Sequence, residues 1–320
     1  MMKIGYIFAG QGAQKSGMGK EFYDHFEASR VVYDRANLAL GYDLKSLCFH
    51  GSQEELNKTE ITQPAILTTS IAILKAFETK IDMIPAAVAG LSLGEYTAHV
   101  SAGSLQFEDA VQLVKKRGAF MQNAVPFGIG GMTALTGVTP ETVAEIVAEA
   151  SAFGIVEVCN FNSTQQIVLG GELAALEKAG EIAKEKGAKR IVPLAVSAPF
   201  HTSMLSKAET ELAEVLETVS FEKMNTPVIS NVDGRIVSSE ERIKHYLAKQ
   251  VTSAVQWVDC IKSMKMMGID TLVEFGPGNA LSSFVAKIDR SIKVLSIHNL
   301  ESFHEAISYF KDQSDLHKAI

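Results

Sequence analysis

The order of apolar and polar positions divides the chain into short strands and longer helices. Runs of consecutive apolar residues predict buried strands at 4–8, 86–89, 228–230, 271–275 and 293–297. Apolar residues three and four positions apart predict helices at 19–40, 65–77, 105–124, 205–216, 243–248 and 281–286. Thr62 and Pro64 stand where a cap and a first turn are expected before the second of these helices. Strands that alternate with helices predict an α/β fold.

A different rhythm runs from residue 127 to residue 196. Its pattern predicts four strands, at 132–138, 155–159, 166–169 and 190–196. It also predicts two helices, at 139–152 and 173–186. The order β-α-β-β-α-β is that of a ferredoxin-like unit, and the polar residues 160–164 are expected to form a turn within it. We therefore expect a ferredoxin-like small domain at 127–196, inserted into a large α/β domain that comprises 1–126 and 197–320.

The composition is that of an ordinary globular protein and argues against some functions. The chain has 320 residues, 47% of them hydrophobic, and its net charge of −7 argues against a general nucleic-acid binder. No apolar run reaches the roughly 18 residues of a membrane span. Cys48, Cys159 and Cys260 lie far apart and form no metal-binding or redox spacing. Together with the absence of a signal peptide, this predicts a cytoplasmic protein without a cofactor or metal.

A glycine-bounded serine is the clearest chemical signal. The sequence GLSLG at 90–94 follows the apolar run 86–89 and precedes a helical pattern that begins at Glu95. Gly-x-Ser-x-Gly at a turn from strand to helix is the nucleophile elbow of α/β-hydrolase-like folds, where small residues let the two elements approach closely. We therefore expect the large domain to be an α/β-hydrolase-like catalytic domain with Ser92 as its nucleophile. The alternative is a glycine-bounded turn with an incidental serine.

A second glycine-bounded loop, GQGAQ at 10–14, follows the first predicted strand. Its backbone N–H groups can bind either a phosphate or an oxyanion. A dinucleotide-binding loop needs a third glycine where this chain has Lys15, and the Gly-Lys-Ser/Thr tripeptide of a P-loop does not follow. The sequence therefore favours an oxyanion-binding loop.

A serine nucleophile needs a base, and His201 is the candidate among the eight histidines. It follows the last strand of the small domain in an irregular segment, whereas His99 lies on the helix after the elbow with poor reach to Ser92. The alternative is that His201 belongs to a turn or cap. No acid between Ser92 and His201 follows a large-domain strand. Either a carbonyl group orients the base, or the assignment of the base is wrong.

Arg117 is a second candidate for the site. It lies in the predicted helix 105–124, directly after Lys115 and Lys116. A guanidinium near the nucleophile binds a planar carboxylate through two hydrogen bonds. The alternative is a solvated helix face, which suits the two lysines. Sequence spacing alone does not separate the two interpretations.

The ordered set of motifs resembles a known family. The set comprises GQGAQ at 10–14, GLSLGEY at 90–96, Arg117, PFH at 199–201, Gln250 and GPG at 276–278. It is similar to the acyltransferase family of fatty acid and polyketide synthesis, which contains the malonyl-CoA:acyl carrier protein transacylases. The resemblance covers nearly the whole chain. The family usually has histidine where this chain has Leu91.

The resemblance implies roles for five catalytic residues. Ser92 is acylated, His201 is its base, and the backbone carbonyl of Gln250 orients His201. The backbone N–H groups of Gln11 and Leu93 form the oxyanion hole. The orientation by Gln250 accounts for the missing acid.

The resemblance also implies substrate contacts and partners. Arg117 grips the free carboxylate of the malonyl group, and Gln11 contacts the substrate. Asn160 either lines the cleft or is a polar turn residue. The expected activity is malonyl transfer from malonyl-CoA to the phosphopantetheine thiol of holo acyl carrier protein, with no nucleic acid or membrane as partner. The alternatives are a free-standing acyltransferase of a polyketide synthase and a thioester hydrolase on the same scaffold.

An acidic carrier protein needs a local basic surface on a chain of net charge −7. Four cations gather near the end of the predicted helix 173–186, namely Lys184, Lys186, Lys189 and Arg190. They are either a docking patch or the solvated end of a helix, where cations interact favourably with the helix dipole.

Overall fold

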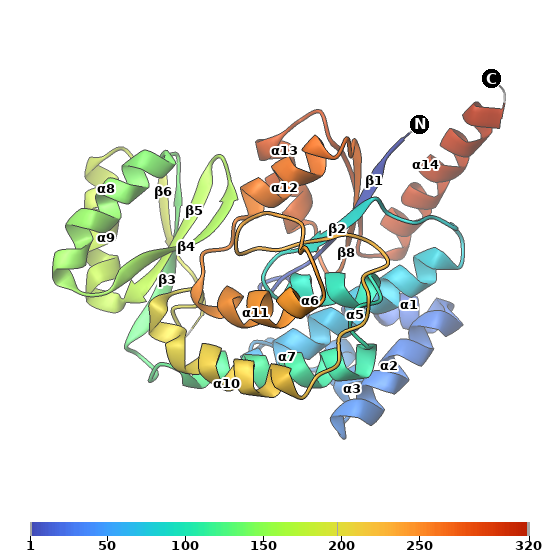
Figure 1. Cartoon of the computed structure of the whole chain (residues 1–320), viewed down its shortest axis with the longest axis horizontal. Helices are drawn as coiled ribbons and strands as arrows, with labels where there is room; N and C mark the ends of the chain where they lie inside the picture. The colour runs from blue at the N-terminus through green and yellow to red at the C-terminus, as the bar shows by residue number, and fades with distance from the viewer. Residues whose placement is uncertain (1, 197, 319–320) are drawn as a thin grey trace. The chain divides into compact units, whose positions relative to one another are not determined.

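The computed structural model describes residues 2–196 and 198–318, and the chain divides into two units (Figure 1). Ser197, where the predicted large domain resumes, lies outside the described residues. The first unit comprises Met1–Lys115, Phe221–Ile229 and Met264–Ile320. The second comprises Lys116–Ser220 and Ser230–Ser263.

A parallel five-stranded sheet forms the centre of the first unit. Its strand order is β7-β2-β1-β8-β9, and every neighbouring pair is parallel. The strands are β1 (Ile4–Phe8), β2 (Ala87–Gly90), β7 (Val228–Ile229), β8 (Thr271–Phe275) and β9 (Lys293–Ile297). All residues of β1, β2 and β8 are buried, as expected for parallel strands between layers of helices. The five strands predicted from apolar runs are confirmed, with ends that shift by one residue at most.

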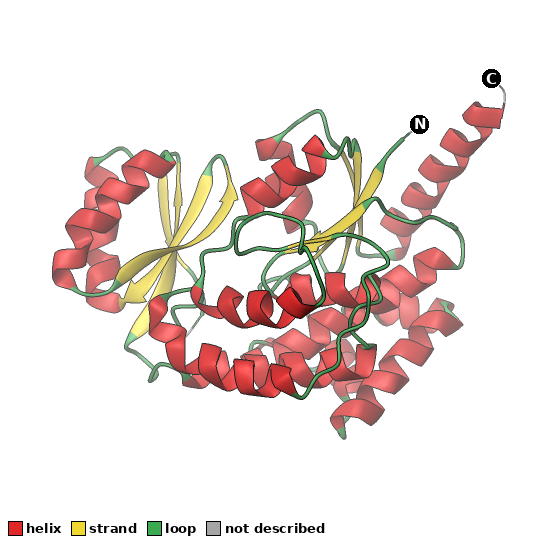
Figure 2. Ribbon diagram, viewed as in Figure 1, coloured by secondary structure: helices red, strands yellow, loops and turns green. Residues whose placement is uncertain are grey.

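Helices connect these strands (Figure 2). They are α1 (Lys20–His25), α2 (Glu27–Leu40), α3 (Leu44–His50), α4 (Gln53–Leu56), α5 (Thr59–Glu78), α6 (Leu93–Ser101), α13 (Ala280–Ile288) and α14 (Leu300–Lys318). Two further helices, α7 (Phe107–Asn123) and α12 (Trp257–Met266), begin in one unit and end in the other. Most residues of α5 are buried, and its Phe77 ring packs edge-on against Phe275 of β8 with centroids 5.4 Å apart.

Two helix predictions for the first unit are wrong in detail. The predicted helix 19–40 is broken at Phe26, which is extended and packs its ring 4.9 Å from that of Phe303. The helix α5 begins at Thr59, so Thr62 is not its cap and Pro64 lies inside it. Proline at this position removes one backbone hydrogen bond of the helix, and the extensive burial of α5 outweighs that loss.

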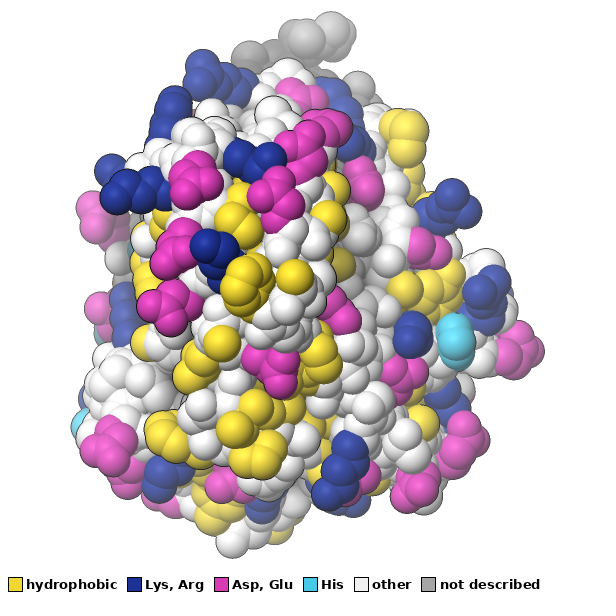
Figure 3. Space-filling view, turned by 90° about the vertical axis from the view of Figure 1, so that its left-hand side faces the viewer, with side chains coloured by type: hydrophobic (Ala, Val, Ile, Leu, Met, Phe, Trp, Pro, Cys, Tyr) yellow, Lys and Arg dark blue, Asp and Glu magenta, His cyan; other side chains and the backbone are white. Residues whose placement is uncertain are grey.

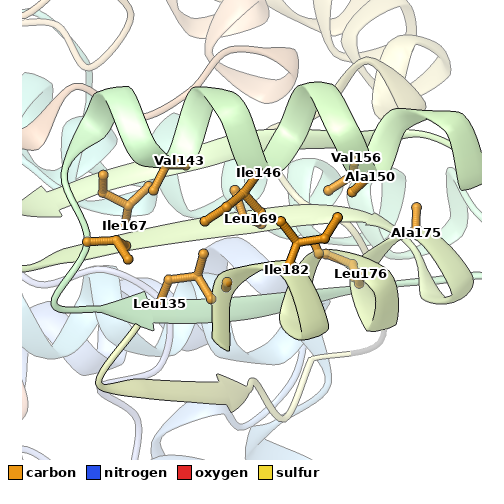
Figure 4. Close-up of a cluster of buried hydrophobic side chains, with 13 residues drawn as sticks. Leu135, Val143, Ile146, Ala150, Val156, Ile167, Leu169, Ala175, Leu176 and Ile182 are labelled. Carbon is orange, nitrogen blue, oxygen red and sulfur yellow. The ribbon is translucent and has the colours of Figure 1, made fainter. Parts of the chain in front are cut away.

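A four-stranded antiparallel sheet lies in the second unit. Its strands are β3 (Gly130–Thr136), β4 (Val156–Ser163), β5 (Gln166–Glu172) and β6 (Arg190–Pro193), in the order β4-β5-β3-β6. Its helices are α8 (Pro140–Ala150) and α9 (Leu173–Glu185), followed along the chain by α10 (Ser206–Glu217) and α11 (Glu241–Lys249). Apolar side chains of α8 and α9 pack on one face of this sheet, where Ile146, Leu169 and Ile182 meet (Figure 4). Element order and strand order together give the predicted ferredoxin-like unit.

The strand β4 is longer than the sequence predicts. The expected turn at 160–164 is wrong, because β4 continues to Ser163 through two irregularities in its register with β5. Asn160 therefore lies in a strand and is 7% exposed. Val255 covers this part of β4, since its backbone N–H donates to Cys159 and its carbonyl accepts from the N–H of Phe161. Val255 thus forms a short parallel bridge with Asn160 at the edge of β4.

Candidate active site

Ser92 occupies a strained turn between β2 and α6. Its backbone dihedrals are φ 53° and ψ −103°, and among the described residues only Ser92 and His201 are non-glycine residues with positive φ. Such conformations cost about 1–3 kcal/mol each and persist where the surrounding structure holds them. The Ser92 side chain is largely buried. This geometry is that of the predicted nucleophile elbow.

The two glycines of the elbow are required by close backbone contacts. A Cβ atom on Gly90 would lie 2.0 Å from the carbonyl group of Gly94, and one on Gly94 would lie 2.2 Å from the carbonyl oxygen of Phe8. Neither position can hold a larger residue without moving the strand or the helix. The motif predicted the turn because it supplies glycine at the two points where the backbones meet.

The loop after β1 lies beside this turn. The strands β1 and β2 are parallel neighbours with Phe8 opposite Gly90, so both loops leave the same edge of the sheet. The N–H of Leu91 donates to the carbonyl of Phe8, and a Cβ on Gly10 would lie 2.4 Å from the carbonyl oxygen of Leu91. The side chain of Leu91 therefore packs over Gly10, which directly precedes Gln11.

Two backbone donors of this edge are available for an oxyanion. Within the described residues, the N–H groups of Gln11 and Leu93 donate no hydrogen bond to another residue. Leu93 is the first residue of α6, where the N–H has no intrahelical acceptor and the helix dipole favours negative charge. The arrangement has the donors that an oxyanion hole needs.

The side chain of Gln11 is held by α5. Its Oε1 accepts from Nε2 of Gln63 at 3.3 Å, and its Nε2 donates to Oγ1 of Thr59 at 3.5 Å. Gln63 is fully buried and Thr59 nearly so. Gln63 is not among the site residues predicted from the sequence, because a glutamine beside an apolar helix gives no chemical signal until the fold shows what it contacts.

His201 lies in the second unit and is 4% exposed. Its Nδ1 lies 2.8 Å from the backbone carbonyl oxygen of Gln250, the residue that follows α11. A carbonyl oxygen only accepts, so Nδ1 carries the proton and Nε2 is the basic nitrogen. Burial, followed by the nearby charge of Arg117, lowers the pKa of His201 to about 4. The imidazole is therefore neutral at pH 7, as a general base must be.

Arg117 is buried in the second unit with an exposed fraction of 1%. Its Nη2 donates to the side-chain Oε1 of Gln250 at 2.7 Å. A solvated helix face is therefore excluded for Arg117, which is buried, whereas Lys116 is exposed. Lys115 places its ammonium 5.0 Å from the centre of the Tyr42 ring. Spacing could not distinguish these residues because three adjacent positions cover most of the helix circumference.

The other histidines whose side chains are described lie in surroundings different from that of His201. His99 is fully buried, its Nδ1 donates to Oγ of Ser104 at 2.9 Å, and burial lowers its pKa to about 3. The hydroxyl of Ser104 in turn donates to the carbonyl of His99, so the pair closes the end of α6. The side chains of His25, His50, His245 and His304 are exposed. His298 is half-buried.

A buried carboxylate in the first unit serves another purpose. Glu274 of β8 accepts from the N–H groups of Leu281 and Ser282, so it caps the start of α13. Burial raises the pKa of Glu274. Directly after β8, Gly276 has φ 138°, and a Cβ on it would lie 2.6 Å from that of Ala9. The GPG motif therefore packs closely against Ala9, two residues before Gln11.

The predicted site residues are divided between the two units. Ser92, Leu93 and Gln11 belong to the first unit, and His201, Arg117, Gln250 and Asn160 belong to the second.

In the described part of the chain, no group of three or more His, Cys, Asp or Glu side chains could hold a metal ion. No helix among the described residues is long and apolar enough to cross a membrane.

Comparison with known proteins identifies the family. Residues 5–318 match the acyl transferase domain family. The chain is 41% identical to the malonyl CoA-acyl carrier protein transacylase of Bacillus subtilis over 316 residues, which cover 98% of this chain and 99% of that protein. It is 48% identical to the transacylase of the same name from Clostridium perfringens, whose crystal structure superposes with a TM-score of 0.95 over 99% of both chains.

A third relative was solved as a complex. It is a malonyl-transacylase bound to its type II PKS acyl-carrier protein, and it is 38% identical to this chain. The TM-score is 0.93, with 96% of this chain and 99% of that chain covered. Sequence and structure therefore agree over nearly the full length, and the chain belongs to the acyl transferase domain family, the family of the malonyl CoA-acyl carrier protein transacylases.

Proposed function

We propose that this protein transfers a malonyl group from malonyl-CoA to the phosphopantetheine thiol of holo acyl carrier protein, through an ester on Ser92. The observation that carries the proposal is the strained elbow at Ser92 in a chain whose relatives are malonyl CoA-acyl carrier protein transacylases. The proposal assigns Ser92 as nucleophile, His201 as general base, Gln250 as its orienting carbonyl, and Gln11 and Leu93 as oxyanion donors.

In the first half-reaction, the Ser92 hydroxyl gives its proton to Nε2 of His201 and its oxygen attacks the thioester carbonyl. The N–H groups of Gln11 and Leu93 stabilise the oxyanion that forms. The tetrahedral intermediate then expels the coenzyme A thiolate, which takes the proton from His201. The low pKa of His201 supports this role, because a proton bound there is readily given to the leaving thiolate.

In the second half-reaction, the phosphopantetheine thiol gives its proton to His201 and attacks the Ser92 ester. Collapse of the intermediate returns the proton to the Ser92 oxygen and releases the malonyl thioester of the carrier protein. The buried guanidinium of Arg117 supports selection of acyl groups with a free carboxylate, since a desolvated cation binds an anion strongly. We also propose that Gln11 and Asn160, which is 7% exposed on β4, contact the substrate.

The complex with a type II PKS carrier protein favours a second candidate. In that case the acceptor belongs to polyketide rather than fatty acid synthesis, and the chemistry on Ser92 is the same. A thioester hydrolase is the remaining alternative, in which water replaces the carrier thiol.

Intact-protein mass spectrometry after incubation with malonyl-CoA tests the proposal. We expect a malonyl adduct on the enzyme that persists in buffer and clears when holo acyl carrier protein is added. Carrier proteins of the two pathways, offered in parallel, distinguish the first two candidates by their relative rates. Rapid clearance of the adduct in buffer alone would instead identify a hydrolase.

Ser92→Ala should abolish the adduct. The three free cysteines, Cys48, Cys159 and Cys260, are buried, and burial raises the pKa of the thiols of Cys48 and Cys159. They therefore offer no replacement nucleophile. The matched control is Ser46→Ala, a change on the exposed side of α3, which should acylate at the wild-type rate. An adduct on Ser92→Ala would overturn the assignment of the nucleophile.

We further propose a division into a large catalytic domain, 1–126 and 197–320, and a ferredoxin-like small domain, 127–196. The antiparallel sheet β4-β5-β3-β6 with α8 and α9 supports the small domain. We propose a cytoplasmic location, which the three free thiols support.

A further inference from the structure

Gln250 makes two different contacts from two different groups. Its backbone carbonyl accepts the Nδ1–H of His201 at 2.8 Å, and its side-chain Oε1 accepts from Nη2 of Arg117 at 2.7 Å. The residue is fully buried at the start of a single 3₁₀ turn, Gln250–Thr252. The assigned role of Gln250 concerns the carbonyl alone, so the side chain needs a separate explanation.

We propose that the side-chain amide of Gln250 positions the guanidinium of Arg117 for the acyl carboxylate, and so sets the preference of the enzyme for acyl groups that carry a free carboxylate. This inference rests on the proposed function, in which Arg117 binds that carboxylate. Gln250 is thus a positioning residue that acts on selectivity through Arg117.

The chemistry of the contact suits positioning. The Arg117 side chain is long and has many rotamers, and its guanidinium presents its donors in one plane. A hydrogen bond to one nitrogen restricts the positions that the guanidinium can take, and its position decides whether a carboxylate can meet two donors at once. Arg117 is 1% exposed, so water cannot easily replace Gln250 as the acceptor for its guanidinium.

The neutrality of the amide matters as much as its position. A carboxylate at position 250 would also hold the guanidinium, but it would cancel the charge that attracts the acyl group. Glutamine accepts the same hydrogen bond and leaves the cation its full charge. The preference for an anionic acyl group therefore depends on an amide, and not an acid, at this position.

Substitution of Gln250 separates its two contacts. Any residue at this position keeps the backbone carbonyl that accepts from His201, whereas the side-chain contact with Arg117 can be removed. Gln250→Met has a similar volume and no acceptor for Arg117. Single-turnover acylation of Ser92, measured with malonyl-CoA and with acetyl-CoA by rapid quench and mass spectrometry, gives the ratio of the two rates. We expect Gln250→Met to lower the malonyl-to-acetyl ratio about 10- to 100-fold, the range expected when a charged group loses a hydrogen bond. Gln250→Glu should lower it as well.

The matched control is Gln112→Met, the same change on the exposed side of α7, which should keep the wild-type ratio. A double-mutant cycle shows whether the effect passes through Arg117. In the Arg117→Ala background, Gln250→Met should lower the malonyl-to-acetyl ratio no further. A Gln250→Met effect that is equal for both acyl groups, or that persists without Arg117, would overturn the inference.

The same data distinguish this inference from the proposed function. If Arg117→Ala leaves the malonyl-to-acetyl ratio unchanged, then Arg117 does not bind the carboxylate and the proposed selectivity fails. If Arg117→Ala lowers the ratio and Gln250→Met does not, only the positioning role of the Gln250 side chain is wrong. Acetylation of each variant also reports that it is folded.

Discussion

Ser92 and His201 share an uncommon backbone conformation, with φ values of 53° and 63°. Positive φ in a non-glycine residue is costly and is therefore a sign of functional constraint when the surrounding structure enforces it. At Ser92 the enforcement comes from glycines that bring β2, α6 and β1 into contact. The two residues that the sequence predicts as nucleophile and base are thus also the two with unusual backbones.

Arg117 should influence the pH dependence of the base. Its charge is the second cause, after burial, of the low pKa of His201, so Arg117→Ala should raise that pKa. The base works as the neutral imidazole, so activity falls as the pH drops through the pKa. We therefore expect the acid limb of kcat/KM for acylation by acetyl-CoA to start near pH 4 in the wild type and to move to higher pH in Arg117→Ala.

Acetyl-CoA is the right probe for this measurement, because it has no carboxylate to titrate or to bind Arg117. Rapid mixing that jumps the enzyme to each pH limits acid damage, and Lys116→Ala is the control for a lost charge on the exposed side of the same helix. An acid limb that stays in place in Arg117→Ala would mean that another group sets the pKa of the base.

At the scale of single residues, the sequence was informative where a residue has a distinctive chemistry. Ser92 and His201 could be proposed from a motif and from position in the chain, and the burial of Arg117 could not. Asn160 was left open between cleft and turn, and the turn is excluded because β4 extends through it. The bulges that allow this extension depend on pairing with distant residues, which local polarity does not encode.

At the scale of elements, α5 supports the oxyanion loop from outside the site. Gln63 reaches the side chain of Gln11, and the burial of α5 fixes where Gln63 stands. The helix itself was predicted from its apolar residues. Its start was predicted wrongly, because Thr62 and Pro64 have the residue types of a cap and a first turn but lie inside the helix. Tertiary burial rather than the local cap signal decided where the helix begins.

Gln63→Met tests this support. The loss of a buried hydrogen bond should let the Gln11 loop shift, and a misplaced oxyanion donor slows acylation whatever the acyl group. We expect single-turnover acylation to fall about 10-fold with malonyl-CoA and with acetyl-CoA alike. This pattern differs from that of Gln250→Met, which should act on the ratio.

Thermal unfolding followed by circular dichroism shows whether Gln63→Met remains folded at the assay temperature, and Gln112→Met again serves as the exposed control. A selective loss of malonyl transfer would contradict the assignment of Gln63 to the oxyanion loop. Unchanged rates for both acyl groups would show that Gln11 does not need this contact.

At the scale of the whole molecule, charge limits where an acidic carrier protein can dock. The four cations considered as a docking patch or a solvated helix end are not equivalent, because Lys186 is paired with Glu145 at 2.8 Å and Glu149 at 3.0 Å. Figure 3 shows acidic side chains beside basic ones on the face turned to the viewer, with no continuous basic surface there. Lys184, Lys189 and Arg190 remain exposed, so the candidate patch is smaller than the sequence suggested.

The double reversal Lys189→Glu with Arg190→Glu tests the reduced patch. If it docks the carrier protein, KM for holo acyl carrier protein in the transfer half-reaction should rise about 10-fold at low salt. The acylation half-reaction with malonyl-CoA should be unaffected, since no carrier protein takes part. Salt screens the attraction between exposed charges over about 8–10 Å at ordinary ionic strength. Because the double variant no longer has this attraction, its transfer rate should depend less on ionic strength. Lys80→Glu with Lys311→Glu, which reverses two other exposed lysines, controls for net charge. Equal carrier-protein kinetics in the two double variants would leave Lys189 and Arg190 with no docking role.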